Sequence, residues 1–215
     1  MNYRQKAPRA NKVVQGIEEA GGRAVAVGGD VTVAEDRAAL LDAAIENFGS
    51  LDVLVLNASG GMESKFGEDY AMKLNRDAQA ALADAAIERM DAGGQIVFVT
   101  SHQAHFIDEV ETMDSYEPVA RSKRAGEDAL RERIETMKAK GIGFVVVSGD
   151  MIEGTITATL LNRAEPGAIE ARREAAGKLY SVEEFAEQIA ALVGRTDLEV
   201  GHTELVGGAR DFLSR

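Results

Sequence analysis

The chain has 215 residues, a formal net charge of −12 and no cysteine. This length suits one domain with a sizeable core, and the acidic balance argues against a nucleic-acid partner. The lack of cysteine excludes disulfides and thiol chemistry, and the lack of a long apolar run or signal segment predicts a cytoplasmic protein with no membrane partner.

Short apolar runs alternate with helical periodicity along the chain. Strands are expected at 23–31, 51–61, 94–101, 141–150 and 202–208. Helices are expected at 32–49, 67–91 and 118–140, and a last helix begins after Ser181. Two pairs, Thr32 with Glu35 and Ser181 with Glu184, have the spacing of a capping box. Continuous apolar strands that alternate with helices predict an α/β fold with a parallel sheet covered on both faces.

Small or polar residues follow four of the expected strands. Ligands bind beyond the carboxyl ends of parallel strands, so these residues would meet at one edge of the sheet. They are Asp30, then Asn57 to Gly61, then Thr100 to His102, then Ser148 to Asp150. Turn residues are expected at strand ends in any protein, but four such ends together favour a binding site.

The ordered set of segments resembles the short-chain dehydrogenase/reductase family. The segments are "GGDVT", "LDVLVLNASGG", "KLNRDAQ", "IVFVTS", "VARSKRAG", "VVVSGDMIEGT" and "HTELVGG". Leu56, Ser59 and Ser148 replace residues that the family pattern has as Asn, Gly and Pro. The similarity runs from residue 1 to the end, and it implies one Rossmann-type domain over 1–215.

This resemblance implies an oxidoreductase that interconverts a small carbonyl and an alcohol with NADP(H) or NAD(H). Ser101 would orient the carbonyl, and Tyr116 would donate the proton. Lys123 would bind ribose and tune Tyr116, and Asn75 would hold a relay water. The implied cofactor contacts are Arg4, Asp30, Val31, Asn57, Ala58, Ser59, Lys123, Ile152 and Thr155. Arg4 follows the segment that resembles the family's second strand, where members that prefer NADP place a cation for the 2′-phosphate.

The expected tyrosine position is occupied by a valine. Family enzymes place the tyrosine four residues before the lysine on one helix, and here that position is Val119. Tyr116 lies seven residues before Lys123, a rise of about 10.5 Å if both were helical. Pro118 suits a helix start, so Tyr116 can lie before the helix and fold back toward Ser101. Alternatively, Tyr116 only packs under the helix start as a hydrophobic staple.

The amino end also departs from the family pattern. No strand with a glycine-rich turn precedes residues 1–22, which look like the family's second strand and second helix. Ala10, Val13, Val14 and Ile17 would form the apolar face of that helix. The expectation is therefore an amino-terminally truncated domain with unpaired strand edges and impaired cofactor binding. The structural alternative is a real short form with a rearranged sheet. A non-catalytic, degenerate Rossmann domain that serves in binding or assembly remains the alternative.

Other residues near the strand ends suggest weaker alternatives. His102 could act as an acid or base. Ser101, His102 and Asp108 could form a hydrolase triad, but no Gly-x-Ser-x-Gly turn is present. A metal site from His102, His105 and Asp108 lacks helical ligand spacing. Asp150 and Glu153 could touch substrate, under a cover formed by 156–180.

Family members commonly assemble through two long helices, which would be 67–91 and 118–140 here. The resemblance therefore implies a homodimer or homotetramer. Ala78, Ala81 and Ala85 would permit close packing of the first helix, although they suit an internal contact equally well.

Overall fold

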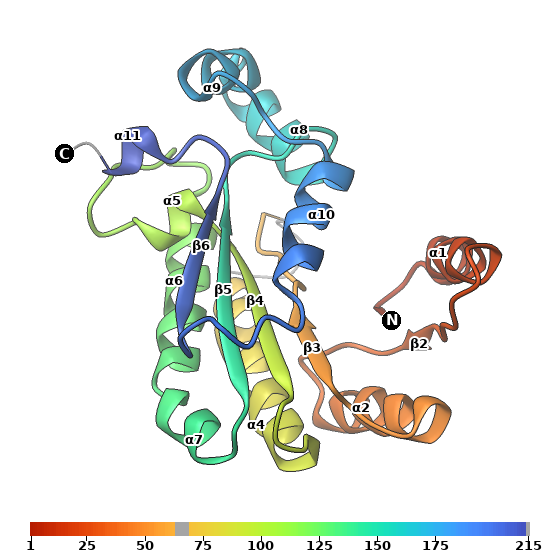
Figure 1. Cartoon of the computed structure of the whole chain (residues 1–215). Coiled ribbons are helices and arrows are strands. Elements are labelled where there is room, and N and C mark those ends of the chain that lie inside the picture. The colour runs from red at the N-terminus through yellow and green to blue at the C-terminus, as the bar shows by residue number, and fades with distance from the viewer. Residues whose placement is uncertain (63–68, 214–215) are drawn as a thin grey trace.

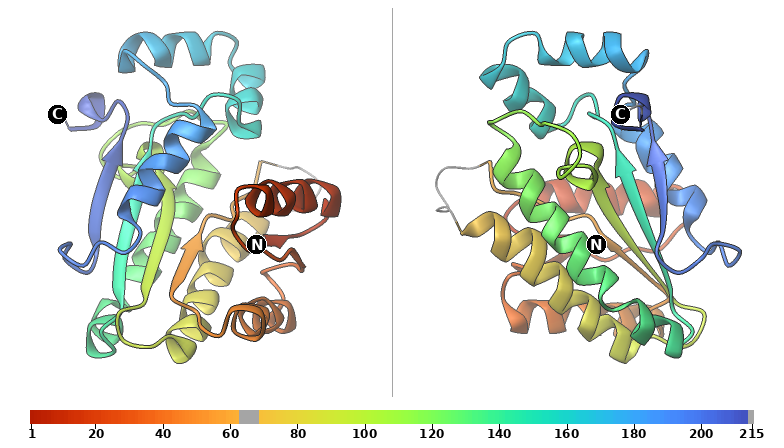
Figure 2. Two further views of the ribbon diagram at one scale, coloured as in Figure 1. Left: turned by 45° about the vertical axis from the view of Figure 1, so that its right-hand side comes forward. Right: turned by 90° about the vertical axis from the view of Figure 1, so that its left-hand side faces the viewer.

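A four-stranded parallel sheet forms the centre of the protein in a computed structural model, which describes residues 1–62 and 69–213. Its strands, in spatial order, are β3 (Val53–Leu56), β4 (Gln95–Ser101), β5 (Gly143–Gly149) and β6 (His202–Val206). Figures 1 and 2 show α4 (Gln79–Arg89) and α6 (Glu117–Arg131) on one face and α10 (Val182–Leu192) on the other. The predicted α/β architecture is confirmed.

The apolar runs of β4 and β5 are buried because helices cover both faces of this sheet. Successive residues of these strands pack alternately into two hydrophobic cores, one on each face of the sheet. Ile96 and Phe98 pack with Leu82 and Leu130 toward α4 and α6, whereas Val97 packs with Leu192 toward α10. Every strand neighbour is parallel, so the carboxyl ends of β3, β4 and β5 lie at the same edge.

A second, two-stranded sheet lies beside the first. It pairs β1 (Asn2–Tyr3) with β2 (Val27–Gly28) and is accompanied by α1 (Ala7–Glu19) and α2 (Ala34–Phe48). Within residues 1–62 and 69–213, β1 bonds only to β2 and β3 bonds only to β4. Val55 in β3 is accordingly 43% exposed. The predicted strand over 23–31 is reduced to two residues, and only Ala10 of the expected apolar face of α1 is buried.

The two long predicted helices are interrupted. The described part of the first consists of α3 (Tyr70–Met72), a π-helical turn η2 (Lys73–Ala78) and α4. The second consists of α6 and α7 (Ile134–Ala139). Ala78 belongs to the protein's own core and Ala85 packs against it, so these residues make an internal contact. Residues 67 and 68 of the predicted range lie outside the described part of the chain.

Four short helices follow strand ends or form the cover over the sheet edge. They are α5 (His102–His105), α8 (Ile156–Ala164), α9 (Ala168–Ala176) and α11 (Arg210–Leu213). Segment 156–180 does lie over the carboxyl ends of the strands, as expected from the sequence.

One predicted capping box is confirmed and the other is wrong. Ser181 and Glu184 exchange the two hydrogen bonds of a capping box at the start of α10. Thr32 instead donates its hydroxyl to the carboxylate of Asp30 at 2.8 Å, and α2 begins at Ala34 after Val33. The capping box fails because Val33, which has no side-chain acceptor, is the cap residue of α2 in place of Thr32.

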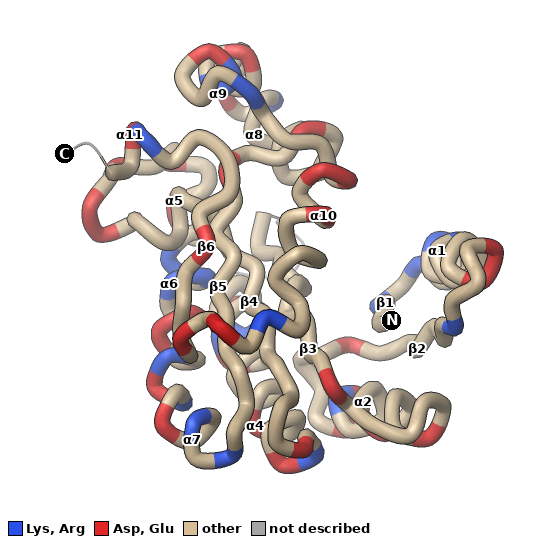
Figure 3. The backbone as a smooth tube through the Cα atoms, viewed as in Figure 1, with Lys and Arg blue, Asp and Glu red and all other residues tan. Residues whose placement is uncertain are grey.

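Charge is distributed over most helices. Figure 3 shows acidic residues on most of the outer elements, so the net charge of −12 is not concentrated in one patch. Among the described residues, no helix is both long and apolar enough to span a membrane.

Candidate active site

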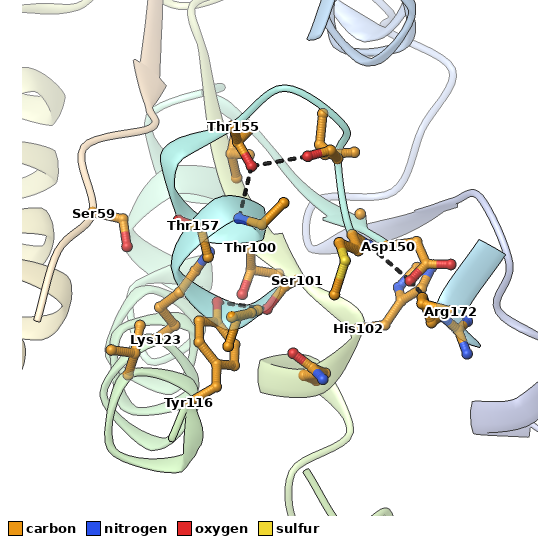
Figure 4. Close-up of a pocket in the computed structure, with 18 of the residues that line it drawn as sticks. Ser59, Thr100, Ser101, His102, Tyr116, Lys123, Asp150, Thr155, Thr157 and Arg172 are labelled. Carbon is orange, nitrogen blue, oxygen red and sulfur yellow. Dashed lines mark hydrogen bonds and ion pairs between the residues drawn. The ribbon is translucent and has the colours of Figure 1, made fainter. Parts of the chain in front are cut away.

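A cavity of about 650 Å³ opens at the carboxyl ends of β3, β4 and β5, beneath α8. This volume lies within the range of small-molecule sites. Ser101, Tyr116 and Lys123 all line it. Figure 4 shows Tyr116 and Lys123 at one side of this cavity, and His102, Asp150 and Arg172 at the other.

The structure brings Ser101 and Tyr116 together. Ser101 ends β4 and begins α5, where its Oγ accepts a hydrogen bond from the backbone N–H of Ala104 at 3.3 Å. Tyr116 is the residue before α6, and its backbone N–H bonds to Met113 at 2.8 Å. From this cap position its side chain turns inward, is 4% exposed, and places its hydroxyl 3.3 Å from Ser101 Oγ. The chain therefore folds back before the helix.

Val119 occupies the first turn of α6 and faces the protein interior. It packs in a cluster with Ala104, Ile107 and Tyr116, and it lines the cavity together with Tyr116. Lys123, one turn further along α6, enters the same cavity as Tyr116. An acid from the cap and a cation from the helix thus meet at one site.

Asn75 lies behind the cavity wall rather than in it. It is buried in η2, where its side chain bonds both backbone groups of Gly60, at 3.2 and 2.8 Å. Its Nδ2 also donates to Ser122 Oγ at 2.8 Å, which links η2 to α6. A side chain added at Gly126 of α6 would come within 2.0 Å of the Asn75 carbonyl oxygen, so glycine permits this close helix contact.

The expected cofactor contacts divide into two groups. Asn57, Ser59, Ile152 and Thr155 line the cavity together with Lys123. Thr155 also caps α8, accepting from Ala158 and donating to Ile152. The other group, outside this cavity lining, consists of Arg4, Asp30, Val31 and Ala58.

Arg4 and Asp30 lie at the ends of the two-stranded sheet. Arg4 donates to the Tyr70 hydroxyl, and its guanidinium lies 5.6 Å from the centre of that ring. Burial alone would raise the pKa of Asp30. Hydrogen bonds from Thr32, with the charges of Arg4 and Lys73, outweigh burial and hold that pKa below its ordinary value. This end of the molecule therefore favours an ionised carboxylate beside two cations.

His102 points away from Ser101. Its Nδ1 lies 2.8 Å from Ser148 Oγ, and burial lowers its pKa to about 4, against the opposing charge of Asp150. His105 instead faces Glu127 at 2.9 Å, and exposed Asp108 lies near Arg121. These directions do not form a hydrolase triad. Within residues 1–62 and 69–213, no group of three or more histidine, aspartate or glutamate side chains could hold a metal ion.

Sequence reasoning missed Arg172. This residue of α9 binds Asp150 at 2.7 Å and Asp211 at 2.8 Å, and it lies over the ring of Phe212. It joins the cover of the cavity to the end of β5 and to α11. An acidic residue directly after a buried strand was the available signal, because a carboxylate there needs a cation.

Comparison with known proteins identifies the family. A family model described as enoyl-(acyl carrier protein) reductase matches residues 1–201. The chain belongs to the short-chain dehydrogenase/reductase family. A short-chain dehydrogenase/reductase of this kind is an oxidoreductase with a Rossmann fold, in agreement with the parallel sheet described above.

Curated relatives match over different lengths. A 1-cyclohexenylcarbonyl-CoA reductase of Streptomyces collinus is 29% identical, over 100% of this chain and 78% of the relative. A versicolorin reductase 1 of Dothistroma septosporum is 31% identical, over 48% of this chain and 42% of its own length. The chain therefore matches less than half of this fungal relative.

Solved structures of short-chain dehydrogenases share the fold. A dehydrogenase/reductase from Sinorhizobium meliloti superposes with a TM-score of 0.77 at 25% identity, over 97% of this chain and 83% of that one. A short-chain dehydrogenase from Burkholderia cenocepacia, solved in complex with NADP, gives a TM-score of 0.79 at 23% identity. That likeness covers 96% of this chain and 84% of the other.

Proposed function

We propose that this protein is an NAD(P)-dependent oxidoreductase that interconverts a small carbonyl compound and its alcohol. The observation that supports this most directly is the 3.3 Å approach of the Tyr116 hydroxyl to Ser101, in a cavity that Lys123 also lines. Carbonyl reduction needs a hydroxyl that orients the carbonyl, a phenol that donates a proton, and a cation that stabilises the phenolate.

Each side chain has a distinct role in the proposed reaction. Ser101 donates a hydrogen bond to the carbonyl oxygen and holds it beside Tyr116. The Tyr116 hydroxyl then transfers its proton to this oxygen as negative charge develops there. The ammonium of Lys123 favours the phenolate that remains and binds the ribose hydroxyls. A reduced nicotinamide, when bound, supplies the hydride.

The residues fit one end of the cofactor better than the other. Lys123, Tyr116, Asn57 and Ser59 offer donors and acceptors for the nicotinamide riboside within the cavity. The segment from β1 to α1 resembles the family's second strand and second helix, so it would not supply the glycine-rich cradle of the pyrophosphate. Arg4, with Lys73 near Asp30, is our candidate for the 2′-phosphate of NADP. We assign Asn75 two roles: it positions the loop at Gly60, and it holds the water of the proton relay.

The substrate class follows from the relatives only in outline. The Streptomyces relative is named as a 1-cyclohexenylcarbonyl-CoA reductase, and two fungal relatives as a versicolorin reductase and a probable tetrahydroxynaphthalene reductase. We therefore propose a small carbonyl or alcohol as substrate, with a homodimer or homotetramer as the working assembly.

Titration of the full chain with NADPH, followed by nicotinamide fluorescence, tests the cofactor half of this proposal. We expect saturable binding that weakens about 10- to 150-fold in Lys123→Ala, because a charge-assisted hydrogen bond contributes about 1.5–3 kcal/mol. Lys138→Ala, which removes an exposed cation, should bind like the parent. Absence of saturable binding in the parent would instead support the non-catalytic binding or assembly role.

A further inference from the structure

A buried carboxylate joins the turn after Ser101 to the helix that holds Lys123. Glu127 of α6 is 0% exposed, and both its oxygens lie 2.9 Å from His105 Nδ1 in α5. Arg131 donates its Nε to Glu127 at 2.9 Å and binds Gly201 and Thr203 beside β6. Arg124 adds a bond from α6 to the backbone oxygen of His105 at 2.9 Å. Three elements therefore meet at one carboxylate.

This carboxylate remains ionised in spite of its burial. Burial raises the pKa of a carboxyl group, but the hydrogen bonds and charges of His105 and Arg131 outweigh it and hold the pKa of Glu127 below its ordinary value. A buried charge is tolerated only when donors satisfy it. His105 is the donor from α5, so removing its ring leaves Glu127 bonded to Arg131 of its own helix, which in turn binds Gly201 and Thr203.

His105 closes the short turn that Ser101 opens. Helix α5 runs only from His102 to His105, with Ser101 as its cap. Ser101 Oγ accepts from Ala104 at one end of this turn, and His105 binds Glu127 at the other. A single helical turn is too short to be stable by itself. Its place over α6 therefore depends on such side-chain anchors.

We propose that His105 and Glu127 are positioning residues that hold Ser101 at hydrogen-bonding distance from Tyr116. This inference rests on the proposed function, since it assigns the pair a role in the same reaction. Tyr116 is fixed at the start of α6, whereas Ser101 ends β4 and caps α5. The His105–Glu127 contact ties α5 to α6, and so sets the relation between the two hydroxyls. Neither His105 nor Glu127 lines the cavity, so neither touches substrate.

Two substitutions at His105 separate anchoring from mere filling of space. His105→Ala removes the donor to Glu127. His105→Asn keeps an N–H at the place of Nδ1, because both nitrogens are bonded to Cγ. His202→Ala is the matched control, because it breaks another histidine–glutamate pair, His202 with Glu204, at a half-exposed site.

Hydrogen exchange reports on the anchor without any need for turnover. The backbone N–H groups of Ala104 and Phe106 close the α5 turn, on Ser101 Oγ and on the His102 carbonyl. We expect His105→Ala to speed their exchange, and His105→Asn and His202→Ala to leave it near the parent rate. Unchanged exchange in His105→Ala would overturn the anchoring role.

Steady-state reduction of 2,3-butanedione by NADPH reports on the catalytic consequence. We expect kcat to fall about 10- to 100-fold in His105→Ala, since a small misplacement of a reacting group has effects of this size. The KM for NADPH should change less than about twofold, because the cofactor contacts are untouched. His105→Asn should restore most of kcat.

A loss of thermal stability with kcat unchanged would show that His105 is structural only, and it would overturn the positioning role. A parent protein without NADPH binding would instead overturn the proposed function. The exchange experiment would then still decide whether His105 anchors α5.

Discussion

The Tyr116 hydroxyl lies 3.3 Å from Ser101 Oγ although Tyr116 lies just outside the helix that holds Lys123. Its position depends on the cap conformation before Glu117 and on the apolar cluster around Val119, rather than on the repeat of the helix. A phenol placed this way reaches the cavity without the usual four-residue spacing from the lysine.

Substitution of Tyr116 by phenylalanine tests its role as proton donor. We expect turnover to fall about 10²- to 10⁴-fold, the usual contribution of a general acid, while the ring still fills its buried place. Carbonyl reduction assays, with NADPH binding measured alongside, check this. Tyr180→Phe is the control, since Tyr180 lies outside the cavity lining. Activity close to that of the parent would remove Tyr116 from the mechanism.

Gly126→Ala is expected to destabilise the protein. The new methyl group would lie 2.0 Å from the Asn75 carbonyl oxygen, so α6 must move away from η2. Overpacking of this kind costs about 1–3 kcal/mol. Chemical unfolding checks the change. Gly16→Ala in α1 has no atom within 4 Å of its new methyl group, and we expect it to stabilise by about 0.5–1 kcal/mol. Equal effects of the two changes would contradict the close helix contact.

His102 should make stability depend on pH. Burial lowers its pKa from 6.5 to about 4, so the folded protein binds its proton less readily than the unfolded chain. The resulting stability is present above pH 6.5 and is lost as pH falls toward 4. It amounts to about 3 kcal/mol, as an upper value.

Urea unfolding at pH 7 and pH 5 measures this dependence. His102→Gln should show a smaller loss between the two pH values than the parent, whereas His202→Gln should behave like the parent. A parent-sized loss in His102→Gln would assign the pH dependence to other groups.

Arg172→Gln should loosen the cover of the cavity. Asp150, whose side chain is 5% exposed, would lose the cation that compensates its burial, at a cost of about 3 kcal/mol. Thermal unfolding and limited proteolysis within 156–176 check the change. The neighbouring Arg173, in a more exposed pair with Glu153, supplies the control Arg173→Gln. Adding Asp150→Asn to Arg172→Gln should recover part of the loss, and failure to do so would argue against the ion pair as the cause.

Most of the fold could be predicted because its strands are continuous apolar runs. β4 and β5 were expected within two residues of their ends, since both are buried on both faces. The strands outside the central sheet were less predictable. The expected strand 23–31 depends on partners far away in the sequence, and only Val27 and Gly28 find one. The helix breaks after Arg131 although the sequence has no proline or glycine at that point, so the apolar periodicity alone could not predict the break.

The site could be predicted as a set of residues but not as a geometry. Ser101, Tyr116 and Lys123 follow from their order along the chain. The return of Tyr116 toward Ser101 depends on loop 106–115, whose path no local pattern determines. The resemblance implies that Asn75 holds a relay water, but it does not predict that the Asn75 side chain binds Gly60. The pairing of Glu127 with His105 joins residues 22 positions apart and leaves no local signature.

A search pattern that requires a tyrosine four residues before the lysine finds Val119 here and does not detect Tyr116, the proton donor that we propose. Residues on one helix keep a fixed spacing, and such patterns detect them. A donor on the residue before the helix escapes them, because a cap position tolerates insertions that a helix does not. Relatives that are classified as inactive by the tyrosine–lysine spacing alone are therefore worth inspecting for an aromatic residue just before this helix.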